Sequence, residues 1–145
     1  MGTQQILLIV LSVIIVGVAI AVGISMFGNQ AYNSNQSALS GELQHYAAQV
    51  VSYYKTPIAQ GGCGLNANNL SPTGVSTYLG FDPTAHTLTT DNGTYKVTLA
   101  QPSDTTVVVT GLGKELKNGN HPLIITRIHL GTGLIASDVS AGLQN

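Results

Sequence analysis

The chain has 145 residues, of which 8% are charged, and its formal net charge is −1. This length leaves room for one modest domain beside a separate apolar segment. With only five Lys and Arg residues, the chain has no basic surface for a nucleic acid and no polybasic stretch for anionic lipid. Its single cysteine, Cys63, excludes a disulfide within the chain and leaves a small apolar loop residue as the simplest interpretation.

An uncharged apolar segment, residues 6–27, begins almost at the first residue and contains no proline. Residues 2–5 hold neither Lys nor Arg, so the segment lacks the basic region of an ordinary secretory signal. A helix of this length spans about 33 Å, which is enough to cross the hydrocarbon core of a bilayer. We therefore expect a helix that a membrane, or copies of itself, must shield.

The following residues give a weaker and then a clearer helical signal. Residues 29–37 are polar and poor in strong helix formers, which predicts either a loop or a weak stretch within one long helix. Apolar residues then recur at steps of three and four, which predicts an amphipathic helix over residues 38–56 that Pro57 ends. The apolar stripe comprises Leu39, Leu43, Tyr46, Ala47, Val50, Val51 and Tyr54.

The remainder of the chain is predicted to be a loop and a sheet. Gly, Asn and Pro punctuate residues 58–80, which favours a loop with at most a short turn. From residue 86 the hydrophobic period falls to two, which is typical of strands. The predicted strands are residues 86–90, 94–100, 105–110, 123–130 and 134–139, with a glycine-rich connection over residues 111–121.

Helices precede all the strands, which predicts the α+β fold class. A long N-terminal hydrophobic helix, interrupted or not, should continue into the amphipathic helix, which packs on a small C-terminal antiparallel sheet. Three parts follow: residues 1–28 as the hydrophobic helix of a membrane or filament core, residues 29–57 as the weak stretch and amphipathic helix, and residues 58–145 as the loop and β-sheet domain. The first helix is apolar all round, so the sheet cannot be its only partner.

The apolar run from Ile6, the amphipathic continuation over residues 39–54 and the C-terminal strands together resemble the type IV pilin superfamily. The resemblance implies that a prepilin peptidase removes a short leader, which makes Met1 the mature and methylated first residue. It also implies that the subunit waits in the cytoplasmic (inner) membrane until the inner-membrane pilus assembly machinery adds it to an extracellular filament of identical subunits. No cofactor is expected.

Individual positions receive roles from this resemblance. Family members commonly carry Glu at the fifth mature position, where it answers the amino-terminal charge of an adjoining subunit. Here Gln5 can accept a hydrogen bond from the amine but brings no opposite charge. Either Gln4 and Gln5 solvate the amine, or Met1 is not the mature terminus, and bacterial and archaeal origins both stay open. The positions expected to pack in the filament core are Ile6, Leu7, Ile9, Val10, Val13, Ile14, Gly17, Ala21 and Ile24.

Patterns for catalysis are incomplete, and we expect no enzyme, no metal site and no cofactor. Ser52 and Lys55 fit SxxK, but the companion SDN and KTG patterns are absent. Residues 111–114 read GLGK, but the further glycine that a phosphate loop requires is absent, because Val108 and Leu116 occupy the corresponding positions. The four His residues lack metal-ligand spacing. Three sequons, at Asn35, Asn69 and Asn92, are candidate glycosylation sites.

Three functions remain open from the sequence. The first is a structural subunit of an extracellular pilus-like filament used in adhesion, motility or surface contact. The second is a minor pilin or pseudopilin of a secretion or DNA-uptake fibre. The third is a monomeric, single-pass membrane-anchored binding protein. The abundance of the chain in material sheared from cells, and its oligomeric state in detergent, would separate them.

Overall fold

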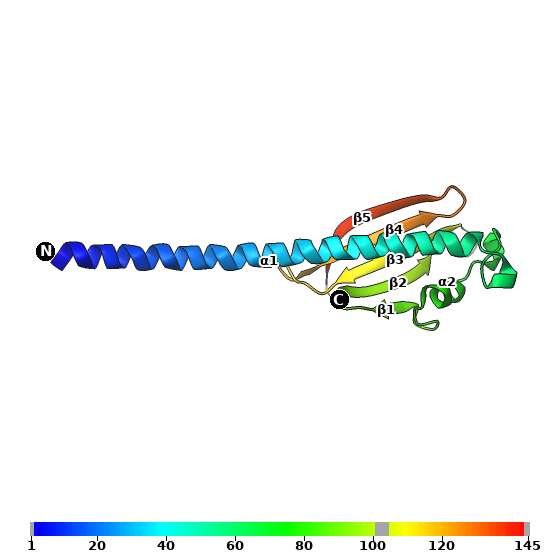
Figure 1. The fold of residues 1–145 in the computed structure, drawn as a ribbon, viewed down its shortest axis with the longest axis horizontal. Helices are drawn as coiled ribbons and strands as arrows, with labels where there is room; N and C mark the ends of the chain where they lie inside the picture. Colours follow the sequence, from blue (N-terminus) through cyan, green and yellow to red (C-terminus); the bar gives the residue numbers. More distant parts are fainter. Residues whose placement is uncertain (1, 101–104, 144–145) are drawn as a thin grey trace.

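The computed structural model describes residues 2–100 and 105–143, and it has one very long helix with a small sheet packed against its C-terminal half (Figure 1). The α+β class is therefore confirmed, with the sheet at the C-terminal end of the chain. The elements are α1 (Gly2–Lys55), 3-10 turns at Ile58–Gln60 and Ala67–Asn69, α2 (Pro72–Leu79), β1 (Thr87–Thr89), β2 (Gly93–Leu99), β3 (Thr106–Gly113), β4 (Asn120–His129) and β5 (Leu134–Leu143).

Helix α1 is continuous over 54 residues, so the weak polar stretch is part of one long helix and not a loop. At about 1.5 Å per residue, α1 is about 80 Å long. Its N-terminal half extends away from the domain, and its C-terminal half lies along the sheet (Figure 1). Contact with the domain begins in the weak stretch itself, where Tyr32 and Asn35 are half-buried. Tertiary contacts therefore support a segment whose own helix propensity is low.

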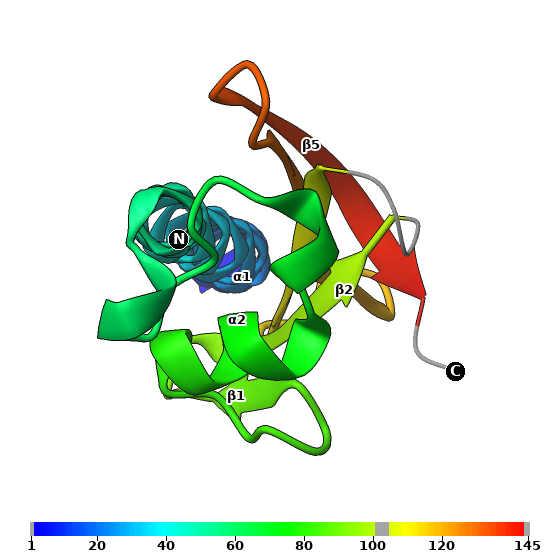
Figure 2. The same cartoon turned by 90° about the vertical axis from the view of Figure 1, so that its right-hand side faces the viewer.

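The five strands form an antiparallel meander in the order β1-β2-β3-β4-β5. Each strand pairs with its neighbour in sequence, and the longest ladder joins β4 to β5 over ten residue pairs, from Asn120↔Leu143 to His129↔Leu134. Viewed along α1, the helix covers one face of the sheet and α2 lies beside β1 and β2 (Figure 2). We call the face toward α1 the inner face and the opposite one the outer face.

The predicted apolar stripe of α1 supplies one side of the core. Leu39, Leu43 and Val50 are fully buried, whereas Tyr46 and Val51 are only partly buried. From the sheet, inner-face residues complete the core, as the period of two predicts: Tyr95, Val97, Val107, Val109, Ile124 and Ile128. Tyr53, which lies outside the predicted stripe, is also buried, because its ring packs on Tyr78 of α2 with centroids 5.2 Å apart.

The glycine-rich connection was predicted to begin at residue 111, and this boundary was wrong. Gly111 and Gly113 both belong to β3. Gly111 pairs with Ile124 of β4, and Gly113 pairs with Gly93 of β2. A Cβ on Gly111 would lie 3.0 Å from Leu43 Cδ1, and one on Gly113 would clash with Asn35 Oδ1. These glycines therefore lie in a strand because α1 crosses it too closely for a side chain.

Two other boundaries also differ. Residues 72–79, predicted as loop, form α2, whose first turn Ser71 caps by accepting a hydrogen bond from the Gly74 amide at 3.0 Å. Gly80, at φ 76°, ends the helix in a left-handed conformation. Strand β5 continues to Leu143 instead of ending near residue 139, because the β4 ladder extends that far.

Candidate assembly surface

The N-terminal half of α1 is an exposed apolar rod. All 16 large apolar side chains from Ile6 to Phe27 are at least 48% exposed, and the described residues of the domain bury none of them. Within residues 2–100 and 105–143, α1 is the one helix long and apolar enough, by length and composition, to cross a membrane. Such a helix can anchor the chain in a membrane. We call residues 6–27 the apolar rod.

The positions expected to pack in a filament core all lie on this rod and are all exposed in the single chain. At 100° per residue these positions fall on one side of the helix, within an arc of about 160°, and the other apolar residues of the rod cover its remaining sides. A Cβ added to Gly17 or Gly23 would meet nothing within 4 Å, so neither glycine is required by the fold of one chain. Met1 lies outside the described residues, and Gln5 is exposed near the start of α1.

Where α1 meets the sheet, polar side chains fasten it to the turn between β1 and β2. Asn35 Nδ2 donates to the Asn92 carbonyl at 2.8 Å, and Asn92 Nδ2 donates to Glu42 Oε1. Asn35 Oδ1 in turn accepts from the Glu115 amide at 3.4 Å, in the connection after β3. We call Asn35, Glu42 and Asn92 the polar clamp. It fixes where the helix leaves the domain, and so fixes the direction of the rod.

Tyr95 lies beside the clamp on β2 and is fully buried. Within the described ranges, its hydroxyl and Glu42 Oε2 are buried without a partner in hydrogen-bonding geometry. Burial, together with the neighbouring Glu42 carboxylate, raises the pKa of Tyr95 well above its ordinary value. The raised pKa therefore keeps Tyr95 protonated to a more alkaline pH than an ordinary tyrosine, and the fold depends on that neutral form.

The clamp engages two of the three sequon asparagines. The side-chain amides of Asn35 and Asn92 hold helix and sheet together, and both residues are half-buried. A glycan on either side-chain nitrogen would interfere with the hydrogen bonds of the polar clamp. Asn69 is exposed, and its amide donates only a 3.3 Å bond to the Cys63 carbonyl. The sequence identified the two clamp asparagines but not their structural role, which is visible only in the hydrogen bonds that join Asn35 to Asn92 and Asn92 to Glu42.

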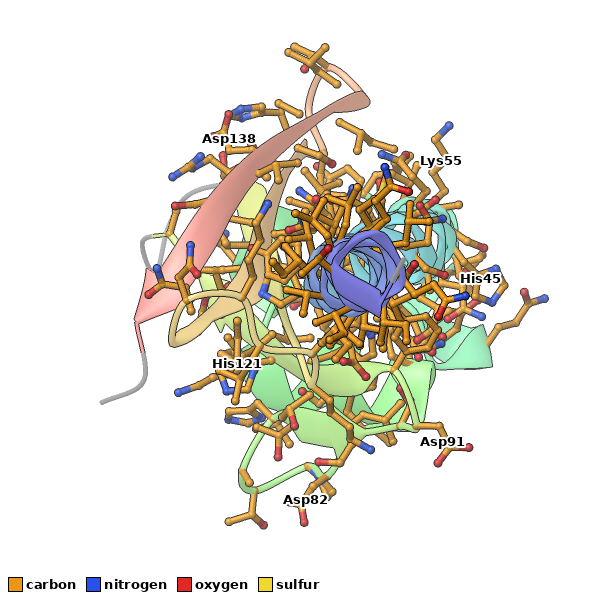
Figure 3. All side chains as sticks on the ribbon, turned by 90° about the vertical axis from the view of Figure 1, so that its left-hand side faces the viewer. His45, Lys55, Asp82, Asp91, His121 and Asp138 are labelled. Carbon is orange, nitrogen blue, oxygen red and sulfur yellow. The ribbon has the colours of Figure 1, made fainter. Side chains whose placement is uncertain are left out.

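The residues considered for catalysis or metal binding lie on the domain and not on the apolar rod. Ser52 and Lys55 are exposed near the end of α1, and Ser52 Oγ lies 3.4 Å from the Tyr78 hydroxyl. His45 on α1 and His121 on β4 lie on different sides of the helix (Figure 3). His86 and His129 contact Ser76 and Thr106 respectively, as is common for structural histidines. In residues 2–100 and 105–143, no three His, Cys, Asp or Glu residues are placed to hold a metal ion.

Cys63 is fully buried in the loop after α1, where its Sγ donates to the Asn66 carbonyl at 2.8 Å. Burial raises the pKa of this thiol, which keeps it protonated and unreactive at neutral pH. This environment agrees with a small apolar residue in a loop.

No protein-family model, no curated protein sequence and no solved structure matches this chain.

Proposed function

We propose that the chain is a structural subunit of an extracellular, type IV pilus-like helical filament, held in the cytoplasmic membrane by its apolar rod before assembly. The observation that supports this most strongly is the division of α1 into two halves. One half forms part of the domain core, and the other is apolar on every side and is not buried by any described residue of its own chain. A rod of this kind is suited first to lipid and then to a bundle of sister rods.

The free energy involved is large compared with the stability of the domain. Burying a Val, Leu or Ile side chain is worth about 1.5–3 kcal/mol when it is complete. Even at about 1 kcal/mol each, the 16 exposed side chains of the rod represent about 16 kcal/mol. A whole domain is typically stable by only about 5–15 kcal/mol. Shielding the rod from water therefore matters to the chain as much as folding its domain does.

The filament proposal also implies its partners. A prepilin peptidase would release the amino terminus, and the inner-membrane assembly machinery would move the rod from lipid into the fibre. The domain would then form the outer wall, and its few charges are compatible with close packing of copies. Adhesion, motility or surface contact would be the use of such a fibre.

The test replaces Gly17 and Gly23 together with Ile. A Cβ at either position would meet nothing within 4 Å, and both changes preserve an apolar helix, so membrane insertion should stay at the wild-type level. Bulky side chains should keep neighbouring rods apart, so filaments sheared from producing cells should fall at least tenfold by electron microscopy. Val18→Ile is the matched control, because it adds a methylene on the same rod and removes no glycine.

Wild-type filament abundance in the double variant would show that the rods do not pack through these glycines. A wild-type chain that forms no filaments, and remains monomeric in detergent, would overturn the proposal in favour of a membrane-anchored monomer. Mass measurement of the N-terminal peptide from sheared filaments would show separately whether Met1 is the processed end and carries a methyl group.

A further inference from the structure

Strand β5 is a long edge strand. It pairs with β4 on one side only, and no strand of residues 2–100 or 105–143 lies on its other side. An edge strand presents unpaired N–H and C=O groups that can pair with another chain. Over its described side chains, residues 134–140, it contains no Pro and no Lys, and Asp138 is its one charge. Its register with β4 is unbroken, so no bulge turns the edge aside. Apart from the charge of Asp138, the devices that usually protect an edge are therefore missing from the described part of β5.

The side chains of β5 also remain open to solvent on its inner face. Val139 pairs with the buried Ile124 on that face and is still 57% exposed, although Gln44 of α1 reaches the neighbouring inner-face residue Ser137, whose Oγ accepts from Gln44 Nε2 at 3.3 Å. Ile135, which pairs with Ile128, is only partly covered. Figure 1 shows β5 running along one margin of the domain beside α1, and Figure 2 shows it farthest from β1.

We propose that β5 pairs with β5 of a second copy, antiparallel and centred on Ser137, and that this contact joins two filaments of opposite polarity. The inference rests on the proposed function for its filament part, whereas the pairing of the strands is independent of it. The β5 sequence is complementary to itself in this register. On the inner face, Ile135 of each copy lies opposite Val139 of the other. The contact therefore contains two equivalent Ile135–Val139 pairs, which shield these apolar side chains from water.

Charge favours the same register. Arg127 on β4 pairs with Asp138 at 2.5 Å within one chain, and Ala136 lies directly beside Arg127 on the outer face. Centring on Ser137 places Asp138 of the second copy opposite Ala136, so Arg127 faces that carboxylate across a small side chain. Asp138 then lies near one arginine from each copy. Centring on Asp138 would instead set two carboxylates directly opposite one another, which is unfavourable.

The symmetry of the contact determines which copies can make it. Pairing of identical antiparallel strands requires a two-fold axis perpendicular to the sheet. Because β5 runs alongside α1, this axis points the two rods in opposite directions (Figure 1). Rods in one membrane, or in one polar filament, all point the same way and cannot be related by it. The β5 contact is therefore reserved for copies on two filaments that lie side by side with opposite polarity.

One such contact is small, but it would repeat along both fibres. Linked sites bind with an effective concentration that raises their combined affinity by orders of magnitude. A weak single contact is consequently sufficient to hold two fibres side by side. Filaments from facing cells approach with opposite polarity, so the contact would favour association between cells.

The first experiment uses the full-length chain in detergent and needs no filaments. Directly opposite residues in an antiparallel pair have Cα atoms about 4.5–5.5 Å apart, within the span of a disulfide. Ser137→Cys should therefore form a disulfide-linked dimer under mild oxidation, at least tenfold more than Leu116→Cys, a matched exposed position in the connection between β3 and β4. Equal crosslinking of the two variants would overturn the β5 contact.

The second experiment uses sheared filaments. Val139→Lys places a charge opposite Ile135 of the second copy and should convert bundles into single filaments, with a fall of at least tenfold in the bundled fraction by electron microscopy. Leu116→Lys, the same type of change on a 54% exposed side chain away from the edge, should leave the bundles intact. Bundles that persist in Val139→Lys would overturn the filament part. A wild type that forms no filaments refutes the proposed function and the filament part, and the crosslinking result then decides the strand pairing alone.

Discussion

At the scale of single residues, the closeness of helix and sheet determines which positions accept a side chain. Gly113 pairs with Gly93 where α1 crosses β3, and a Cβ there would clash with Asn35 Oδ1 and with Pro122. Gly41, on the solvent side of the same helix, has nothing within 4 Å of the corresponding position. The two glycines therefore have opposite roles, although the sequence shows no difference between them.

Gly113→Ala should lower the free energy of unfolding by about 1–3 kcal/mol, because the close crossing must open to admit a methyl group. Gly41→Ala should raise it by up to about 1 kcal/mol, because alanine favours the helix and meets nothing. Chemical unfolding of the full chain in detergent, followed by near-UV circular dichroism of the tyrosines, measures both changes. A Gly113→Ala variant as stable as Gly41→Ala would contradict the close crossing.

Because of Tyr95, the free energy of unfolding of the domain should fall at alkaline pH. In the unfolded chain a tyrosine loses its proton near pH 10. In the fold the pKa of Tyr95 is raised, so above about pH 10 the unfolded chain releases a proton that the folded chain retains. The stability that the neutral hydroxyl contributes below that pH is then lost as pH rises, by at most about 1.4 kcal/mol per pH unit.

Tyr95→Phe should flatten this decline, which unfolding curves between pH 9 and about pH 12 would measure. The pKa values of Tyr46 and Tyr53 are also raised, mainly by burial, so a smaller slope should remain in the variant. An unchanged slope in Tyr95→Phe would assign the pH dependence to those other tyrosines.

At the scale of elements, the sequence predicted most of the fold. The amphipathic stripe and the period-two strands were confirmed, because both depend on which face a repeating pattern buries. The helix α2 was missed although its signals were present: Ser71 as N-cap, Pro72 in the first turn and Gly80 after the last. A helix of eight residues is too short to show a clear hydrophobic period, so the many turn-forming residues around α2 led to the prediction of a loop.

Long-range contacts were beyond the reach of sequence patterns. The end of β3 depends on how closely α1 crosses it, and the polar clamp joins residues 35, 42 and 92, which no local pattern connects. The apolar rod, in contrast, could be predicted from the sequence, because its composition alone distinguishes it from the rest of the chain. The edge exposed by β5 could not be recognised until the order of the strands was known.

Continuity of α1 can be tested between its two halves. A Cβ on Gly28 would meet nothing within 4 Å, and Gly28→Pro removes a helical hydrogen bond and disfavours the helix there by about 3 kcal/mol. The rod should lose its fixed direction, so filaments should become rare by electron microscopy while the thermal unfolding midpoint of the domain stays unchanged. Gly28→Ala, which favours a helix, should assemble normally. Abundant filaments from Gly28→Pro would show that a straight rod is not required.

At the scale of the whole molecule, the two hydrophobic units are separate. Among the residues that the structure describes, the buried core runs from Leu39 to Leu130, so removing residues 1–28 deletes no described core contact. A chain of residues 29–145 should therefore stay in solution without detergent and unfold at the midpoint of the full chain in detergent. Analytical centrifugation and thermal circular dichroism measure the two properties. A truncated chain that precipitates, or unfolds at a clearly lower temperature, would show that the rod also supports the domain.

The lengthwise placement of α1 on the sheet bears on mechanics. A fibre under tension pulls each rod along its own axis, and α1 carries that pull into the domain because the helix is continuous from one half to the other (Figure 1). The force then acts as shear along the whole row of side chains from Leu39 to Tyr54, which must yield together instead of peeling apart singly. A subunit built in this way can resist stretching with neither a disulfide nor a large domain.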